Sequence, residues 1–114
     1  MKELSKFFKA LSDPSRLRIL RMLAIRPLCV CEIQAVLQLA ASTVSKHLSI
    51  LRDAGFIIDE KENKWVNYSL NRQSVNYMVQ ALLPLLLKWM ATDDVFKNDV
   101  DAVTVVDRSK LCKM

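Results

Sequence analysis

Residues Ala41 to Gly55 read ASTVSKHLSILRDAG, a stretch with the periodicity of one amphipathic helix. As a helix it places Val44, Leu48 and Leu51 at positions i, i+4 and i+7, which makes a single apolar stripe. The polar residues point the opposite way: Ser42, Lys46, Ser49 and Asp53. Ala41 or Ser42 begins the helix, and Gly55 ends it because glycine tolerates the left-handed conformation at a helix C-terminus.

A shorter apolar segment just upstream, about Cys31 to Gln38, predicts another helix, so the local pattern is helix, turn, helix. Small hydroxyl side chains crowd the first turn of the 41–55 helix, and Lys46 follows them. Such side chains can approach base edges and phosphates, which is typical of a DNA recognition helix. The alternative from this stretch alone is a surface helix of a small bundle.

The distribution of charge favours a nucleic-acid partner. The chain has 114 residues, enough for one core, with 52% hydrophobic and 25% charged residues and a net charge of +5. Residues 1–55 hold nine Lys/Arg against four Asp/Glu, whereas residues 56–72 and 73–114 are each balanced. A basic half is the electrostatic footprint of a nucleic-acid binder, although a solvated basic face would look similar.

The N-terminus, MKELSKFFKAL, begins an amphipathic helix and not a signal peptide. The apolar run Leu82 to Leu87 is far below the roughly 18 residues that span a bilayer. We therefore expect a cytoplasmic protein with no membrane partner.

The second helix begins with Asp13 as its cap and Pro14 in its first turn, and we expect it to end at Arg26 and Pro27. After Gly55 the period of the apolar residues changes from about 3.6 residues, typical of a helix, to two residues, typical of a strand. Residues 56–61 and 65–70 are predicted strands of a hairpin, or wing, whose turn contains Asn63 in a positive-φ conformation. Its tip carries Lys61 and Lys64, placed for phosphate contact or simply for solubility.

Residues 73–91 predict a long helix that is apolar nearly all round. About 70 preceding residues are too few to wrap it completely, so we expect a second copy to cover one side; the alternative is a fully buried central helix. Pro84 should kink or break it. The tail 92–114 is either a further short helix or a loose segment.

Four motifs in this order resemble the ArsR/SmtB family of winged helix-turn-helix repressors, across about residues 3–91. They are Leu11–Leu20 (LSDPSRLRIL), Thr43–Leu48 (TVSKHL), Leu51–Ile57 (LRDAGFI) and Lys64–Tyr68 (KWVNY). The resemblance implies a mainly α fold of about five helices with a two-stranded wing. It implies a homodimer joined through the first and last helices, which binds operator DNA and leaves it when an inducer binds. Residues 1–91 would form the DNA-binding and dimerisation domain, and 92–114 a C-terminal tail. The expected DNA contacts are Ser42, Thr43, Ser45, Lys46, His47, Arg52, Lys61, Asn63 and Lys64.

The triplet Cys29-Val30-Cys31 resembles the arsenic-responsive branch, whose members bind As(III) or Sb(III) through thiolates at this place. Soft thiolates suit a soft trivalent ion. Positions i and i+2 of a regular helix lie about 200° apart, so this segment must be non-helical to chelate. The branch often carries a third Cys where this chain has Gln34; Cys112, from this or the partner copy, or a small exogenous thiol could replace it. The bland alternative is two small buried apolar residues.

A thiol redox switch in the same repressor is the second interpretation; it would use Cys112 or a mixed disulfide, because vicinal cysteines form a strained bridge. An enzyme is the third and least favoured interpretation, because a chain with one Gly and one His has no phosphate-cradling loop and no recognisable catalytic triad. The zinc-type site that other relatives build on the last helix is excluded, because residues 73–91 contain no Asp, Glu, His or Cys. The single histidine, His47, suits packing or phosphate contact better than metal binding.

Overall fold

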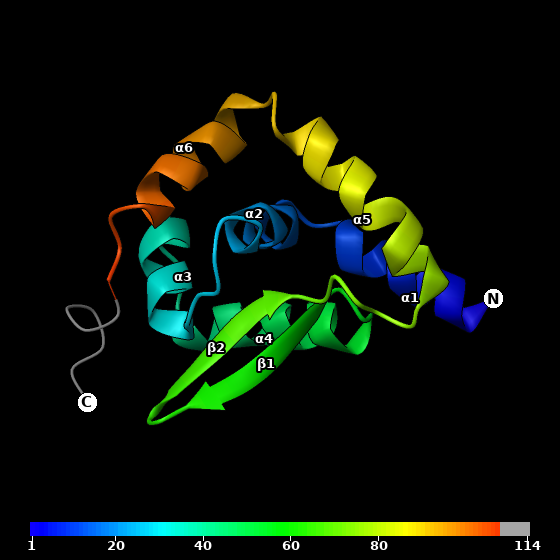
Figure 1. The fold of residues 1–114 in the computed structure, drawn as a ribbon, viewed down its shortest axis with the longest axis horizontal. Coiled ribbons are helices and arrows are strands. Elements are labelled where there is room, and N and C mark those ends of the chain that lie inside the picture. The colour runs from blue at the N-terminus through cyan, green and yellow to red at the C-terminus, as the bar shows by residue number, and fades with distance from the viewer. Residues whose placement is uncertain (108–114) are drawn as a thin grey trace.

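Six helices and one hairpin make up the part of the chain that the computed structural model describes, residues 1–107. In chain order they are α1 (Lys2–Leu11), α2 (Pro14–Leu23), α3 (Val30–Leu37), α4 (Ala41–Asp53), β1 (Ile57–Glu62), β2 (Trp65–Leu70), α5 (Tyr77–Met90) and α6 (Asp94–Val103). Helix α4 and the hairpin lie along one side of the molecule, and α5 and α6 form an arch over α2 on the other (Figure 1).

The α4 stripe is buried as the sequence predicts. Val44, Leu48 and Leu51 are each at most 1% exposed and join one hydrophobic core with side chains of α2, α3 and α5. Phe56 also lies in this core, so it precedes β1 instead of opening the strand. Burial of each such side chain contributes roughly 1.5–3 kcal/mol, which fixes α4 against the other helices.

The helix boundaries follow local capping chemistry. The Asp13 carboxylate accepts a hydrogen bond from the Arg16 N–H at 3.1 Å, and Pro14 occupies the first turn, both as predicted. Helix α2 nevertheless ends at Leu23, short of the predicted Arg26 and Pro27, because residues 24–26 form a turn. Gly55 takes the predicted left-handed conformation, with φ of 91°.

The hairpin is confirmed in both strands and in its turn. Its register pairs Ile57 with Leu70 and Glu62 with Trp65, and Asn63 has a φ of 56°. A third strand-like segment joins it: Leu28 forms an isolated bridge to Tyr68, with backbone N–H to O distances of 3.0 and 2.8 Å. No local pattern of residues indicates this bridge, which ties the residue before Cys29 to the wing.

Helix α5 begins four residues later than predicted. The Asn76 side chain caps it by accepting a hydrogen bond from the Met78 N–H at 2.9 Å, so residues 73–76 belong to the preceding turn. The helix runs through Pro84 without a break. It is not wrapped on every side: Leu85 and Trp89 are exposed, Trp89 at 58%.

Residues beyond 91 include a helix that packs on the domain. Asp99 of α6 is buried and receives two hydrogen bonds from Arg18 of α2, each 2.8 Å long, and Val103 is fully buried. This paired carboxylate raises the pKa of the Arg18 guanidinium, chiefly through the side-chain hydrogen bond. No helix within residues 1–107 is both long and apolar enough to span a bilayer.

Candidate nucleic-acid interface and thiol site

The predicted base-reading side chains lie on the open side of α4. Ser42, Thr43, Ser45 and Lys46 are all exposed, with no part of the core in front of them. Beside them lies a groove of about 480 Å³, lined by Arg16, Ser42, Thr43, Lys46, His47 and Ile50. The first two turns of α4 therefore offer hydroxyl groups and a cation on one accessible surface, as an entry into a DNA groove requires.

His47 lies beside that surface in a partly buried place. Its Nδ1 atom is 3.1 Å from Nη1 of Arg16, whose guanidinium also donates to the carbonyls of Ala10 at 2.8 Å and Lys9 at 3.0 Å. The same Nδ1 atom also lies 3.9 Å from Oδ2 of Asp13, the residue that caps α2. His47 thus helps Arg16 hold α4 against the end of α1.

Arg52 connects α4 to the wing. Its Nη1 atom lies 3.2 Å from Oδ2 of Asp59 in β1, and both side chains are more than a third exposed. An exposed pair of this kind contributes only about 0.2–1 kcal/mol. The pair is nevertheless a direct side-chain link between α4 and the first strand of the hairpin.

The wing tip presents its predicted residues to solvent. Lys61, Asn63 and Lys64 are exposed, and the Lys64 Nζ lies 5.6 Å from the centroid of the Trp65 ring. This distance is within the range of a cation–π contact.

The two vicinal cysteines stand on either side of the α3 boundary. Cys29 is the residue before the helix, with extended backbone angles (φ −93°, ψ 170°), and Cys31 is the second residue within it. Cys29 is 4% exposed and Cys31 is partly exposed. The Cys29–Cys31 segment is therefore not a regular helix, which is the condition that chelation by an i, i+2 pair demands.

The side chain of Gln34 is used elsewhere, since its Nε2 donates to the carbonyl of Leu39 in the turn before α4, at 3.3 Å. Cys112 lies outside the described residues. Within residues 1–107, no three His, Cys, Asp or Glu side chains gather closely enough to hold a metal ion. The described part of the chain thus holds two vicinal cysteines, of which Cys29 is a free thiol and Cys31 is disulfide-bonded.

A capping box holds Cys29 in place. The Glu32 carboxylate Oε1 accepts from the Cys29 N–H at 3.0 Å, and the Glu32 N–H faces the Cys29 side chain. Burial raises the pKa of the Cys29 thiol; the Glu32 carboxylate adds to this, and nearby N–H groups oppose it. The thiol is therefore protonated at neutral pH.

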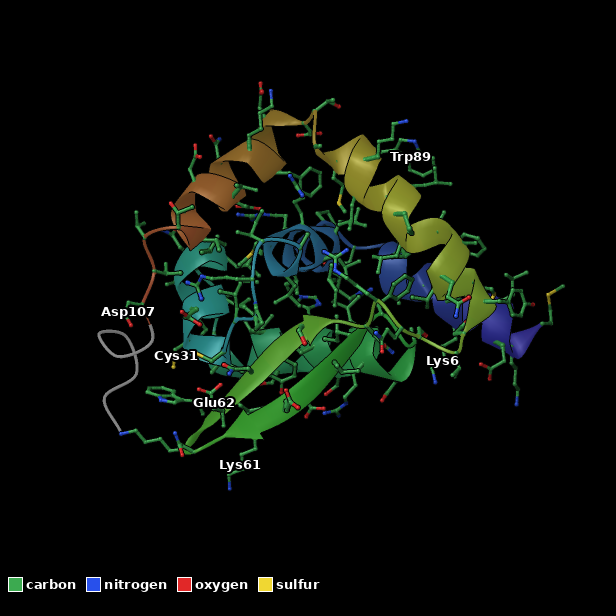
Figure 2. All side chains as sticks on the ribbon, in the orientation of Figure 1. Lys6, Cys31, Lys61, Glu62, Trp89 and Asp107 are labelled. Carbon is green, nitrogen blue, oxygen red and sulfur yellow. The ribbon has the colours of Figure 1, made fainter. Side chains whose placement is uncertain are left out.

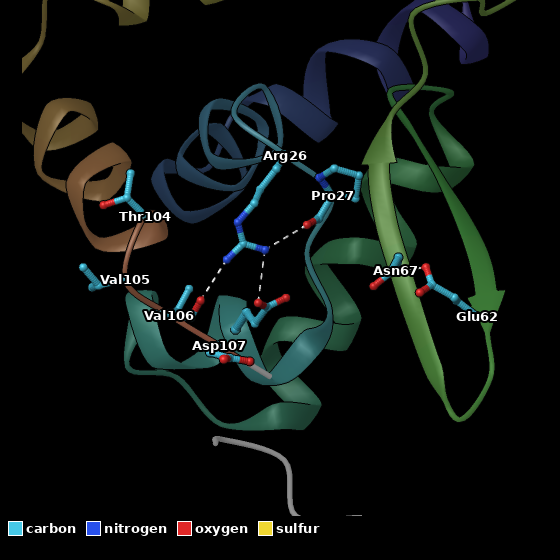
Figure 3. A pocket seen from close by; sticks show the side chains of 9 residues that line it. Arg26, Pro27, Glu62, Asn67, Thr104, Val105, Val106 and Asp107 are labelled. Atoms are coloured by element: carbon cyan, nitrogen blue, oxygen red, sulfur yellow. Dashed lines mark hydrogen bonds and ion pairs between the residues drawn. The ribbon is translucent and has the colours of Figure 1, made fainter. Parts of the chain in front are cut away.

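Arg26 extends this contact to the C-terminal segment. Its Nη1 lies 3.1 Å from Glu32 Oε2, and its Nη2 donates to the carbonyls of Val103 at 3.1 Å and Val106 at 2.9 Å. Figure 3 shows Arg26 with dashed lines to the residues drawn around it, among them Pro27 and Val106. A cavity of about 620 Å³ opens between this cluster and the wing residues Glu62 and Asn67. In Figure 2 Cys31, Glu62 and Asp107 lie on this side of the molecule, and Trp89 lies on the opposite side.

Sequence reasoning missed Glu32, Arg26 and the bridge from Leu28. One signal was available, because Cys29 and Glu32 have the spacing of a capping box, in which the N3 carboxylate reaches back to the N-cap. Arg26 offered none, since its carbonyl partners lie 77 and 80 residues further along the chain.

Comparison with known proteins agrees with this arrangement. Residues 13–59, from the α2 cap into β1, match the model of the arsR family of bacterial regulatory proteins. The chain is 34% identical over 104 residues to the arsenic resistance transcriptional regulator ArsR2 of Pseudomonas putida. The matched region covers 88% of this chain and 90% of that protein.

Two solved structures show the same fold at similar identity. Reduced HlyU from Vibrio cholerae N16961 superposes with a TM-score of 0.63 at 34% identity, covering 77% of this chain and 88% of that one. The cadmium sensor CMTR from Mycobacterium tuberculosis superposes with a TM-score of 0.55 at 35% identity, covering 72% of this chain and 81% of that one.

The family, the winged helix-turn-helix arrangement and the relatives all indicate a DNA-binding regulator and not an enzyme. With α4 as the recognition helix and β1–β2 as the wing, the chain belongs to the ArsR family of transcriptional repressors.

Proposed function

We propose that the reduced form of this protein, in which Cys31 is released from its disulfide, binds operator DNA as a homodimer and leaves it when As(III) or Sb(III) binds the thiols of Cys29 and Cys31. The observation that carries the proposal is the place of the pair. Both cysteines sit at the first turn of α3, with Cys29 outside the helix and Cys31 inside it. The chain is also similar to a regulator named for arsenic resistance.

The donor set fits a thiophilic, hydroxide-bearing ligand. Each thiol that replaces a hydroxide of arsenous acid passes its proton to that hydroxide, which leaves as water. No net proton is released, so a buried and protonated Cys29 does not oppose the exchange. A divalent cation such as Cd²⁺ must instead displace the protons of its ligands, and its affinity falls when a thiol pKa is raised. This difference favours arsenite over cadmium.

The third ligand has three candidate sources. Gln34 cannot replace a thiolate, so Cys112 of the same chain, Cys112 of the second copy or a small exogenous thiol would complete a three-thiolate site. A two-thiol site that keeps one hydroxide is the remaining arrangement. Variants at Cys112 separate the two arrangements that use this cysteine from the two that do not.

The surroundings of Cys29 supply a route from ligand to DNA. Leu28, next to Cys29, is paired with Tyr68 of the wing, and α3 leads through a short turn into α4. In this proposal, binding of the ligand by Cys29 and Cys31 shifts the backbone at residue 28 or at the start of α3. Either movement changes how the wing and α4 are set relative to one another, and DNA affinity depends on that setting.

The DNA-binding surface in this proposal is the exposed face of α4 with the wing tip. The contacts are those predicted from the sequence: Ser42, Thr43, Ser45, Lys46, His47, Arg52, Lys61, Asn63 and Lys64. The dimer would form through α1 and α5, whose Phe8 and Trp89 are 54% and 58% exposed in one copy. Operator binding places the protein in the cytoplasm.

A thiol redox switch is the second candidate. Two observations favour it: Cys31 is disulfide-bonded in the structure, and the chain is similar to a structure of HlyU described as reduced. Because Cys29 is buried and protonated, oxidation in this chain would run through Cys31 and Cys112.

The test is the fluorescence anisotropy of a labelled duplex taken from the upstream region of the protein's own gene. Reduced protein is bound to the duplex and titrated with arsenite while a non-chelating phosphine reductant is in excess. Release by arsenite supports the thiol-ligand proposal; retention, with release only after an oxidant replaces the reductant, supports the redox switch.

Matched variants locate the site. Cys29→Ser and Cys31→Ser should bind the duplex like the wild type and ignore arsenite. Cys112→Ser retains release if the site needs only two protein thiols and loses it if Cys112 is the third ligand. Retained arsenite release in either the Cys29 or the Cys31 variant would overturn the assignment.

A further inference from the structure

Helix α1 presents three faces, and one of them is basic. Phe7 and Ala10 face the core, and Leu4 and Phe8 form an exposed apolar side. The remaining face, here called the lysine face, consists of Lys2, Lys6 and Lys9, spaced i, i+4 and i+7. Because it is separate from the Leu4 and Phe8 side, a dimer formed through the apolar side leaves it open.

The lysine face borders the recognition helix. A groove of about 580 Å³ between α1 and α4 is lined by Lys2, Ser5, Lys6, Lys9, Ser12, Arg16, Ile50 and Asp53. It adjoins the groove over the start of α4, because Arg16 and Ile50 line both. Figure 2 shows Lys6 projecting from α1 on the side where α4 ends. Four cations and one carboxylate thus surround a groove that continues the surface carrying Ser42 and Lys46.

The orientation of the lysine face is fixed. Arg16 donates to the last-turn carbonyls of Lys9 and Ala10 in α1 and contacts His47 of α4. One guanidinium therefore holds the C-terminal end of α1 against the side of α4. The lysine face keeps a constant position relative to the side chains that would enter the DNA groove.

The spacing of these cations suits a DNA backbone. From Lys2 to Lys9 the helix rises about 10 Å. One strand of B-DNA carries a phosphate about every 3.4 Å of its axis, so roughly three phosphates lie alongside that length.

We propose that the lysine face of α1 binds the phosphate backbone of the operator beside the groove that α4 enters. This inference rests on the proposed operator binding and extends the DNA-binding surface beyond α4 and the wing. The contacts are to phosphate, so they add affinity and fix orientation without reading sequence.

The test compares two triple variants of equal charge in the full-length protein. K2Q/K6Q/K9Q removes the lysine face, and R72Q/K88Q/K97Q removes three exposed cations that line neither groove. Circular dichroism and light scattering establish that both keep the fold and the oligomeric state of the wild type. Anisotropy then gives the affinity for the labelled upstream duplex over a series of salt concentrations.

We expect the slope of log K against log[salt] to be less steep in the lysine-face variant than in the wild type, by about 2–3 per protomer. Its affinity near physiological salt should fall at least tenfold, whereas R72Q/K88Q/K97Q should keep the wild-type slope. In an ethylation-interference assay, ethylation of a short run of flanking phosphates should weaken binding by the wild type and have no effect on binding by the lysine-face variant.

Two negative results differ in meaning. An unchanged slope and phosphate pattern in K2Q/K6Q/K9Q, with a reduced slope in Lys46→Ala, would overturn the lysine-face proposal alone. A wild-type protein that binds the upstream duplex no better than an unrelated one would overturn the operator proposal, and the lysine-face proposal with it.

Discussion

Arg26 and Glu32 lie 3.1 Å apart, and through this pair the cap of α3 is joined to the end of α6. The Glu32 carboxylate is 4% exposed and uses its second oxygen to hold the Cys29 N–H. The predicted ligand site and the C-terminal segment therefore share a single guanidinium.

Replacing Arg26 with Ala should destabilise the protein. The change leaves a buried carboxylate without its cation and two carbonyls without a donor, so we expect the free energy of unfolding to fall by about 1–3 kcal/mol. Urea denaturation followed by circular dichroism measures it. Arg26→Lys keeps the charge but cannot serve Glu32 and both carbonyls together, so it should recover only part of the loss. Full stability in Arg26→Ala would contradict the role assigned to this pair.

Stability should depend on pH through Cys29. Burial raises the pKa of its thiol in the folded protein. The contribution of Cys29 to the free energy of unfolding is therefore fully present below the pKa of a cysteine in the unfolded chain, and it is lost as pH rises through the pKa in the folded protein. The wild type should therefore lose stability relative to Cys29→Ala as pH rises above about 8.5. Urea denaturation of both proteins under reductant, in steps above about pH 7, measures the difference. A difference that stays constant across the series would contradict a buried, protonated thiol.

Arg52 and Asp59 offer a test of how the wing is positioned. Arg52→Ala should weaken binding to the operator duplex, either because a phosphate contact is lost or because the wing is released from α4. Asp59→Asn separates the two causes. If the link to the wing matters, it should weaken binding as Arg52→Ala does, and the double variant should be no weaker than either single one. If Arg52 serves only as a phosphate contact, Asp59→Asn should bind as tightly as the wild type or more tightly.

The exposed apolar side of α5 should hold the second copy. Trp89→Glu puts a charge into that surface, so we expect light scattering to report about 13.1 kDa for the variant and about twice 13.1 kDa for the wild type. Val95→Glu is the matched control, because Val95 is 52% exposed but lies on α6. A dimeric Trp89→Glu variant would place the interface elsewhere.

Periodicity and turn chemistry carried most of the fold prediction. The α4 stripe, the Asp13 cap and the positive φ of Asn63 depend on residues close together in the chain, which is why the sequence shows them. Helix ends were less accurate. The segment before Tyr77 has apolar residues at helical spacing, yet the Asn76 side chain offers the backbone a cap, and that local bond starts the helix later.

The candidate sites divide in the same way. The cysteine pair and the α4 side chains were named from local motifs, and the structure places them at a helix boundary and on an open face, respectively. Contacts across the fold could not be read from the chain. Arg26 meets carbonyls 77 and 80 residues away, and Arg18 meets Asp99, because tertiary packing brings these groups together and no periodic pattern records it.

The bridge between Leu28 and Tyr68 is made by backbone atoms alone. Its two hydrogen bonds do not involve the side chains of residues 29–31. In the proposed function, the groups that would hold the inducer are therefore chemically distinct from the link that would carry its effect to the wing. Replacing the Cys-Val-Cys triplet with side chains that prefer another ligand should then change the inducer and keep this link to the wing.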